Sequence, residues 1–350
     1  MSKSLGNGID PMDVIEDHGA DALRFFLTTN STPGLDLRFD EKKMESSWNF
    51  INKIWNAARY VQMQIGDTKP TLDVDCLSSV DKWILSRMNE VLDHVSMNME
   101  KYEFAMVGNE LYSFIWNDFC SWYIELTKVH LNSDNEVEKQ ASAHTLVYVL
   151  NAIVRMLHPF MPFVTEEIYQ AIPHLEESIC ISKYPTVNPD FNDENINKQF
   201  TYLMDIVKGV REIRANYTIK NAIEVEYSIE TKDENLQALL DQCVPYLKKL
   251  CNATCVGYNQ EASKDVATAM IQGGNTLIVE LGAYVDKEAE KQKLQAELQK
   301  LEGEIKRCTN MLSNEKFVSK APQAKVDSER QKLEDYTSKY NAVKEKLAAM

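Results

Sequence analysis

Residues 293–312 read KLQAELQKLEGEIKRCTNML, and residues 332–350 read KLEDYTSKYNAVKEKLAAM. In both stretches apolar side chains recur at alternating steps of three and four residues, which is the heptad spacing of a coiled-coil seam. One seam comprises Leu294, Leu298, Leu301, Ile305, Cys308 and Leu312, and the other comprises Leu333, Tyr336, Tyr340, Val343, Leu347 and Met350. Residues 313–322 lack the repeat and end in a proline that suits the first turn of a helix. The sequence therefore predicts an antiparallel helical hairpin.

The hairpin is expected to project from the rest of the chain. Arms of about 27 residues reach roughly 40 Å at 1.5 Å per residue. A seam this narrow cannot bury such an arm on a globular body, so we expect the arm to contact a partner.

The region before the hairpin shows helical periodicity. Apolar residues recur every three or four positions over residues 48–65, 80–99, 104–131 and 137–157. The connections are short, which favours antiparallel neighbours. Residues 133–136 read as a capping box that opens the last of these helices, and Pro159 ends it before a short helix over 162–171. An antiparallel helix bundle is expected over residues 40–195.

Residues 196–284 have a mixed pattern. A helix with one apolar face comes first, and residues 223–229 then alternate strictly between apolar and polar side chains, as a half-buried strand does. Further strands are predicted over residues 253–258, 267–271 and 276–281. The expected fold is therefore mainly α, and we divide it into residues 1–39 with two short helices, a bundle over 40–195, a small α/β unit over 196–284 and a coiled-coil arm over 285–350.

Composition limits the class of protein. No apolar stretch approaches the roughly 18 residues that cross a membrane, so we expect no membrane-spanning segment. Residues 1–14 resemble neither a secretory signal nor a transit peptide, so we expect a cytoplasmic protein. The seven cysteines are scattered and only Cys251 and Cys255 are close, so we expect reduced thiols and no metal site. The six histidines form no hydrolytic grouping.

The net charge of −15 is unevenly distributed. Residues 286–350 hold 14 Lys and Arg against 12 Asp and Glu, which leaves 24 basic and 41 acidic residues elsewhere. The predicted arm is thus the basic end of an acidic chain. An excess of this size supports nucleic-acid binding only weakly, because a solvated coiled coil can also show it.

Three stretches carry a family resemblance. MSKSLGNGIDPMDVIEDHGADALRFFL at residues 1–27 resembles the signature loop, Lys-Met-Ser-Lys-Ser, and the following helices of class I aminoacyl-tRNA synthetases, although the motif's first lysine has no counterpart before Met1. DLRFDEKKMESSWNFINKIWNAARYV at residues 36–61 is similar to the first anticodon-domain helices of the valine, isoleucine and leucine members. The hairpin, with LSNEKFVSKAP at residues 312–322, is similar to the C-terminal arm of the valine-specific members.

The resemblance implies a role for the first residues. Lys3 would neutralise the phosphates of ATP as valine's carboxylate attacks, and Ser2 and Ser4 would shape the loop. In the family the nucleotide-binding fold, the valine pocket and the editing domain come before this loop. The resemblance therefore implies that ATP with Mg²⁺ and valine act in the full-length enzyme only. We expect this chain to bind none of them and not to aminoacylate by itself.

The resemblance also implies two surfaces that bind valine tRNA. Unpaired anticodon bases would meet polar side chains interleaved with Trp48, Phe50 and Trp55. These polar candidates are Asn49, Asn52, Lys53, Asn56 and Arg59. The outer corner of the tRNA would meet the arm, where the candidates are Lys306, Arg307, Lys316, Phe317, Lys320 and Lys325. In each case the alternative is an ordinary amphipathic helix with solvated charges, and Trp116, Trp122 and Tyr123 are expected in the core.

Two other interpretations remain open. The chain could come from an isoleucine- or leucine-specific member, although the isoleucine members suggest paired cysteines at zinc spacing near the C-terminus, which this sequence lacks. It could also be a non-enzymatic helical protein whose hairpin binds another helix. Under the favoured interpretation we expect a monomer.

Overall fold

The computed structural model describes residues 8–31, 34, 37–65, 71–72, 74–233, 235–261, 265–284, 287–313 and 323–349. The chain divides into two compact units, residues 1–207 with 233–251 and residues 208–232 with 252–350. The helix α9 (Glu194–Asn216) begins in the first unit and ends in the second. The finer division of the chain into four segments remains a prediction.

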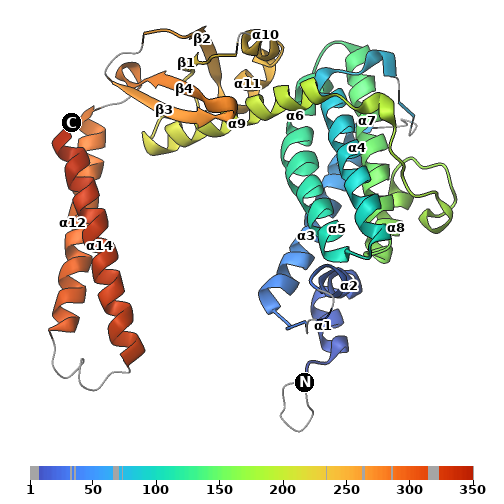
Figure 1. Ribbon diagram of the computed structural model, residues 1–350, viewed down its shortest axis with the longest axis horizontal. Coiled ribbons are helices and arrows are strands. Elements are labelled where there is room, and N and C mark those ends of the chain that lie inside the picture. The colour runs from blue at the N-terminus through green and yellow to red at the C-terminus, as the bar shows by residue number, and fades with distance from the viewer. Residues whose placement is uncertain are drawn as a thin grey trace. The chain divides into compact units, whose positions relative to one another are not determined.

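The first unit is helical, as predicted (Figure 1). Its elements are α1 (Pro11–His18), α2 (Ala20–Thr29), α3 (Glu41–Ile65), η2 (Val74–Cys76), α4 (Ser79–Glu100), α5 (Phe104–Ser113), η3 (Phe114–Tyr123), α6 (Ile124–Leu131), α7 (Glu136–Leu157), α8 (Pro162–Ala171), η4 (Ile179–Ile181), η5 (Pro189–Phe191), α10 (Leu236–Asp241) and α11 (Val244–Cys251). The helices α3, α4, α7 and the continuous run α5–η3–α6 pack along one another as the predicted bundle. The first turns of α9 also pack on it, since Phe200 stacks on Trp83 with ring centroids 5.2 Å apart.

The helix predicted over residues 104–131 contains an unforeseen π-helical segment, η3. The Ser121 hydroxyl donates to the carbonyl of Trp116, five residues earlier, at 2.7 Å, which matches the wider π-helical turn. A π-turn changes which side chains share a face of the helix. The side chains of this segment therefore do not follow a period of 3.6 residues per turn.

The capping box predicted at residues 133–136 does not form. Asn135 is the N-cap of α7, and its side-chain oxygen accepts from the backbone N–H of Val137 at 3.1 Å. Ser133 instead accepts from the N–H of Asn135. The prediction was wrong because the helix begins after Asn135, which puts Ser133 outside the first turn. A capping box does open α4, between Ser78 and Asp81.

The carboxylate of Asp81 lies in the first turn of α4 and is fully buried. It accepts hydrogen bonds from the hydroxyls of Tyr123 (2.7 Å), Ser142 (3.1 Å) and Ser78 (2.6 Å), and from the backbone N–H of Ser78 (3.2 Å). These donors come from η3, α7 and the residue before α4, so one carboxylate joins three segments. Burial, followed by the charge of Asp81, raises the pKa of Tyr123 well above its ordinary value. The phenol therefore stays protonated and keeps donating.

The second unit contains a four-stranded sheet in the order β2-β1-β4-β3. Its elements are β1 (Val225–Glu230), β2 (Ala253–Tyr258), β3 (Val266–Ile271), η6 (Gln272–Gly274), β4 (Asn275–Glu280) and η7 (Leu281–Ala283). β1 pairs parallel with β2 and antiparallel with β4, and β4 pairs antiparallel with β3. The predicted alternation holds in β1, where Val225, Tyr227 and Ile229 are buried. The end of α9 lies close to the sheet, because a Cβ on Gly209 would approach that of Ala269 to 3.0 Å.

The arm is the helix pair α12 (Lys287–Leu312) and α14 (Gln323–Ala349), which pack against each other as predicted. Leu301, Cys308 and Val326 are buried in the seam. The seam also contains Glu329, which lies four residues before Leu333, the predicted start of the second seam. Among the described residues, no helix is both long and apolar enough to cross a membrane.

Two buried tyrosines should respond differently to loss of the hydroxyl. Tyr123→Phe removes a donor to the buried carboxylate of Asp81 and should lower the free energy of unfolding by about 1–3 kcal/mol. The hydroxyl of Tyr184 is buried without a hydrogen-bond partner among the described residues, and burial raises its pKa to about 12. Tyr184→Phe should therefore change stability by less than about 0.5 kcal/mol. Urea unfolding measures both, and equal losses would show that Asp81 does not organise the bundle.

Candidate nucleic-acid interface

The helix α3 presents one apolar face and one polar face. Phe50, Ile54 and Val61 are at most 1% exposed, so this part of the alternative interpretation holds and Phe50 belongs to the core. The predicted polar candidates lie on the opposite face in two neighbouring stripes. One stripe contains Asn49, Lys53 and Asn56, at spacings of four and three residues. The other contains Asn52 and Arg59, which are seven residues apart. Asn49, Asn56 and Arg59 are exposed, whereas Asn52 and Lys53 are half-buried. The structure thus brings all five together on one surface.

Aromatic rings extend this surface. Trp48 and Trp55 are 42% and 38% exposed, which is unusual for such large rings. Trp55 lies seven residues after Trp48, so both share the stripe of Asn52 and Arg59. They are exposed members of a polar face and carry out no packing role comparable to that of Phe50.

A row of contacts runs from the core to this surface. The ring of Phe50 contacts Tyr112 with centroids 4.8 Å apart, and Tyr112 stacks on Trp116 at 5.5 Å with an interplanar angle of 12°. The ammonium of Lys53 lies over Trp116, 5.3 Å from the ring centroid. We call Phe50, Tyr112, Trp116 and Lys53 the aromatic row. It fixes a flat ring and a positive charge at the junction of α3 and η3.

The expectation for three aromatic residues of η3 was only partly right. Tyr123 is in the core, but Trp116 and Trp122 are only half-buried. The ring of Trp116 packs on Tyr112 and on the ammonium of Lys53, so only part of its surface is covered. Tyr112 was missed altogether, although its position four residues before Trp116 signals a shared helix face.

A hollow of about 290 Å³ opens beside Tyr112, between α2, α3 and α5. It is lined by Phe25, Thr29, Asn30, Lys43, Ser46, Ser47, Gly108, Asn109 and Tyr112. The lining combines one cation, amides and hydroxyls with aromatic rings, which suits a flat polar group such as a nucleobase. No sequence motif signalled this hollow, since its lining comes from three separate helices.

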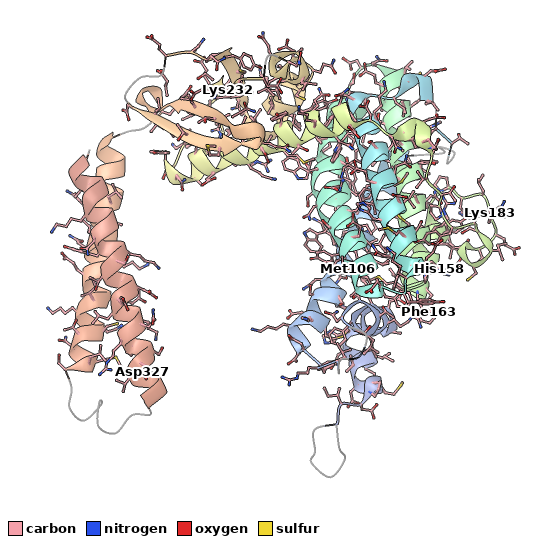
Figure 2. All side chains as sticks on the ribbon, in the orientation of Figure 1. Met106, His158, Phe163, Lys183, Lys232 and Asp327 are labelled. Carbon is pink, nitrogen blue, oxygen red and sulfur yellow. The ribbon has the colours of Figure 1, made fainter. Side chains whose placement is uncertain are left out.

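The helix α2 is tied to the end of the bundle at which His158 and Phe163 lie (Figure 2). The carboxylate of Asp21 accepts from the backbone N–H groups of Phe163 (3.3 Å) and Val164 (2.6 Å), in the first turn of α8. Arg24 donates from Nε to the carbonyl of Phe160 and from Nη2 to that of Pro159. The partial positive charge of the helix N-terminus favours the carboxylate of Asp21.

Close packing reinforces this tie. A Cβ on Gly108 would lie 2.2 Å from Cγ2 of Thr29, so α2 and α5 meet where only glycine fits. Val14, Ala22, Phe26 and Met44 form a buried cluster that joins α1, α2 and α3. The segment that follows the predicted signature loop is thereby fixed to the bundle.

The described part of the arm carries both predicted cations of α12. Lys306 is exposed. Arg307 pairs with Glu304 at 2.9 Å and with Glu329 at 3.7 Å, and Lys332 also binds Glu329 at 2.8 Å. Glu329 further accepts from the thiol of Cys308 at 3.4 Å, which explains how a carboxylate occupies a seam position. The pair between Arg307 and Glu304 is exposed on both sides, and such pairs are weak and can exchange for other anions.

Several predicted residues fall outside the described residues. These are Ser2, Lys3 and Ser4 of the signature loop, and Lys316, Phe317 and Lys320 of the bend. The backbone of Lys325 belongs to α14, but its side chain is not described. Their roles remain predictions.

Comparison with known families defines the class. Residues 1–40 match the family of class I tRNA synthetases for I, L, M and V, and residues 81–229 match the anticodon-binding domain of tRNA ligase. Residues 286–350 match the valyl tRNA synthetase tRNA binding arm. In this order the three matches define the C-terminal part of a class I aminoacyl-tRNA synthetase.

The curated relatives of the chain are valine–tRNA ligases. The valine–tRNA ligase of Enterococcus faecalis (strain ATCC 700802 / V583) is 45% identical over 353 residues, which cover 100% of this chain and 40% of that protein. The valine–tRNA ligase of Bacillus cereus (strain ATCC 14579) is 46% identical over 352 residues, covering 99% of this chain and 40% of that protein. The chain spans about 40% of the length of the curated relatives it matches. It belongs to the valine–tRNA ligases and corresponds to their C-terminal part.

Among solved structures, a chain of the ternary complex of Agrobacterium radiobacter K84 agnB2 LeuRS-tRNA-LeuAMS aligns with 55% of this chain and 23% of its own length. The TM-score is 0.45 and the sequence identity is 20%.

Substitutions in α3 should separate its two faces. Lys53→Ala removes a half-exposed cation over Trp116 and should lower the free energy of unfolding by less than about 1 kcal/mol. Its neighbour Ile54 is 1% exposed, so Ile54→Ala should cost about 2–5 kcal/mol. Urea unfolding followed by circular dichroism gives both values. A loss at Lys53 as large as that at Ile54 would show that Lys53 serves the core rather than a binding surface.

Proposed function

We propose that this chain is the tRNA-binding portion of a valine–tRNA ligase, with two contact surfaces. The polar face of α3 together with the aromatic row binds the anticodon loop, and the α12–α14 arm binds the outer corner of valine tRNA. The whole protein attaches valine to its tRNA in an ATP-dependent reaction. The observation that carries the proposal is the exposed surface on which amides, cations and rings of α3 and η3 lie together.

The chemistry of this surface suits unpaired bases. Splayed loop bases stack on aromatic rings, and Trp48, Trp55 and Trp116 offer partly exposed rings. Amides can donate to and accept from base edges, which supports Asn49, Asn52 and Asn56 as contacts. Lys53 and Arg59 supply positive charge for the phosphates between the bases. The matched anticodon-binding region begins at residue 81, so it contains η3, whereas α3 lies before it and ends at Ile65.

The arm has a different role in the proposal. Lys306, Arg307, Lys316, Lys320 and Lys325 would contact phosphates, and Phe317 would provide an apolar contact at the bend. Phosphate contacts position a nucleic acid without specifying its sequence. Because the chain as a whole is acidic, we expect a small number of such contacts and a correspondingly shallow dependence of affinity on salt.

The first residues connect the chain to the chemistry of the whole enzyme. We propose that Lys3 neutralises the phosphates of ATP in the full-length enzyme, with Ser2 and Ser4 shaping the loop. ATP reacts there as its Mg²⁺ complex, and the enzyme works in the cytoplasm. The tie between α2 and the bundle, through Asp21 and Arg24, supports a mechanical link from this loop to the anticodon surface. Lys3 would stabilise charge that develops on the phosphates during the reaction.

The alternatives are specific and testable. An isoleucine- or leucine-specific enzyme would share the bundle, and the match of residues 286–350 to the valyl arm argues against it. A purely structural helical protein would not require the exposed rings of Trp48 and Trp55 on the polar face of α3.

Substitution of Trp116 tests the anticodon surface. Stacking of a base on an aromatic ring contributes about 1–3 kcal/mol, so Trp116→Ala should weaken binding of a valine tRNA transcript by about 5- to 150-fold. Filter binding at several salt concentrations measures the dissociation constant and counts phosphate contacts. Parallel titrations with isoleucine and leucine tRNAs should give weaker binding.

Trp122→Ala provides the matched control, because Trp122 is half-buried in the same helix but is not in the aromatic row. It should leave the dissociation constant within about twofold, which is less than about 0.5 kcal/mol. No binding by the unchanged chain would refute the proposed function. Equal losses in both variants would remove the aromatic row from the binding surface, and tighter binding of the isoleucine or leucine tRNA would reassign the amino acid.

A further inference from the structure

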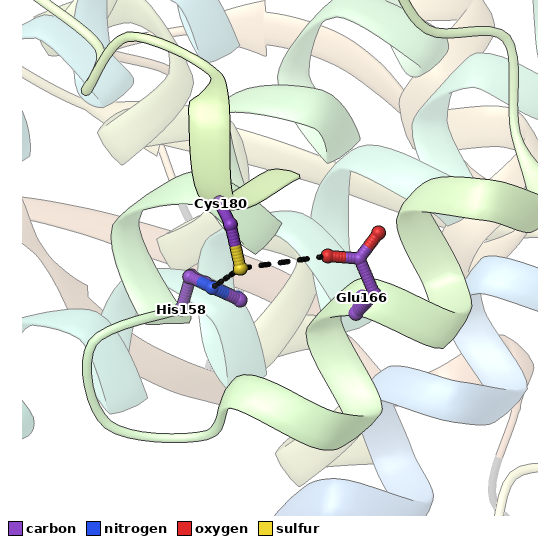
Figure 3. Close-up of side chains that lie close together, drawn as sticks. All are labelled: His158, Glu166 and Cys180. Carbon is purple, nitrogen blue, oxygen red and sulfur yellow. Dashed lines mark hydrogen bonds between the residues drawn. The ribbon is translucent and has the colours of Figure 1, made fainter. Parts of the chain in front are cut away.

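Three side chains with metal-binding atoms meet at one end of the bundle (Figure 3). His158 ends α7, Glu166 lies in α8 and Cys180 lies in η4. The Nε2 atom of His158 is 3.4 Å from Sγ of Cys180, and Sγ is 4.0 Å from Oε2 of Glu166. All three donor atoms lie within 4.8 Å of one another. In the described part of the chain, this is the cluster whose donor set fits a metal ion.

The spacing is close to that of a tetrahedral zinc site. With zinc–sulfur bonds of about 2.3 Å and zinc–nitrogen or zinc–oxygen bonds of about 2.0–2.1 Å, ligand atoms around zinc are separated by about 3.3–3.6 Å. The histidine–cysteine pair already has this separation. The carboxylate oxygen must move toward Sγ by roughly half an ångström, which a partly exposed glutamate on a helix surface can do through its rotatable bonds.

Hydrogen bonds outside the cluster orient His158 in the way that a metal-binding histidine is oriented. Nδ1 of His158 lies 2.8 Å from Oγ1 of Thr165, and that hydroxyl donates its own hydrogen to the carbonyl of Met161 at 2.7 Å. Thr165 therefore accepts from Nδ1, which places the ring proton there and leaves the lone pair of Nε2 directed at Cys180. Metal-binding histidines are oriented in this way by a hydrogen bond from the second nitrogen.

The glutamate is oriented as well. Oε2 of Glu166 accepts from the hydroxyl of Ser178 at 2.8 Å, and Oε1 accepts from Nε2 of Gln170 at 2.8 Å. The same Ser178 hydroxyl accepts from the backbone N–H of Cys180 at 3.2 Å. Ser178 thus connects the segment of the cysteine to the carboxylate, and both ligands have partners outside the cluster.

We propose that His158, Glu166 and Cys180 bind a zinc ion, with water as the fourth ligand. A thiolate and an imidazole beside one carboxylate favour zinc over magnesium or calcium, which prefer oxygen ligands. Cys180 is exposed, so the ion can enter from solvent. The ion fastens η4 to the turn between α7 and α8, and this is the turn whose carbonyls bind Arg24.

Cobalt substitution tests the site directly. The full chain, freed of metal with a chelator, is titrated with Co²⁺ and then with Zn²⁺ at neutral pH. We expect one Co²⁺ per chain, with a thiolate-to-cobalt charge-transfer band and the intense visible bands of four-coordinate cobalt. Zn²⁺ should abolish both. Zn²⁺ should also raise the midpoint of thermal unfolding, because it binds the folded chain.

Matched variants identify the ligands. Cys180→Ser should abolish the charge-transfer band and weaken Co²⁺ binding by more than the about 10- to 100-fold that loss of an outer partner costs. Glu166→Gln should weaken binding while the band persists at saturating Co²⁺. Cys76→Ser, at a partly exposed cysteine outside the cluster, should leave the band and the affinity unchanged. Far-UV circular dichroism confirms that each variant is folded.

Three results would overturn the proposal. The first is an unchanged chain that takes up no Co²⁺ with thiolate character, which would mean that the cluster is a hydrogen-bonded group only. The second is a band that survives in Cys180→Ser. The third is a Zn²⁺-dependent rise in the thermal midpoint that is equally large in the unchanged chain and in Cys180→Ser.

Discussion

The carboxylate of Asp21 at the first turn of α8 is the interaction on which the functional geometry of the first unit depends. It satisfies backbone N–H groups that have no partner within their own helix, and Arg24 binds the carbonyls just before them. Together they place α2 against the bundle, and Gly108 allows Thr29 to approach α5. The hollow beside Tyr112 exists because these helices meet at this distance, so the candidate surface and the position of α2 are consequences of one arrangement.

The helix α3 shows how stability and binding are divided. Its buried side chains pack in the core of the bundle, and its polar side chains and tryptophans lie outside that core. Asp81 also stabilises the bundle from within, because its buried hydrogen bonds with Tyr123 and Ser142 join α4 to η3 and α7. Substitutions on the exposed face can therefore change binding while the fold persists, which is the property that a recognition surface requires.

Periodicity predicted most of the fold, and the family resemblance supplied the candidate residues of the interface. The heptad seams predicted the arm, and the spacing of Asn49, Lys53 and Asn56 puts them on one face of a helix. The sequence could not reveal that Lys53 lies over Trp116, because that contact joins two helices that are more than 60 positions apart in the sequence and depends on how they pack. Nor could it reveal the cluster of His158, Glu166 and Cys180, since its spacing matches no metal motif and only the folding of η4 against α8 brings the side chains together.

Photo-crosslinking of a valine tRNA transcript to the full chain, with peptides identified by mass spectrometry, determines which elements contact the anticodon loop and which contact the outer corner. We expect nucleotides of the anticodon loop to crosslink to peptides of α3 and η3, and nucleotides of the outer corner to crosslink to the arm. Crosslinks from the anticodon loop to other elements, with none on α3 or η3, would contradict this expectation.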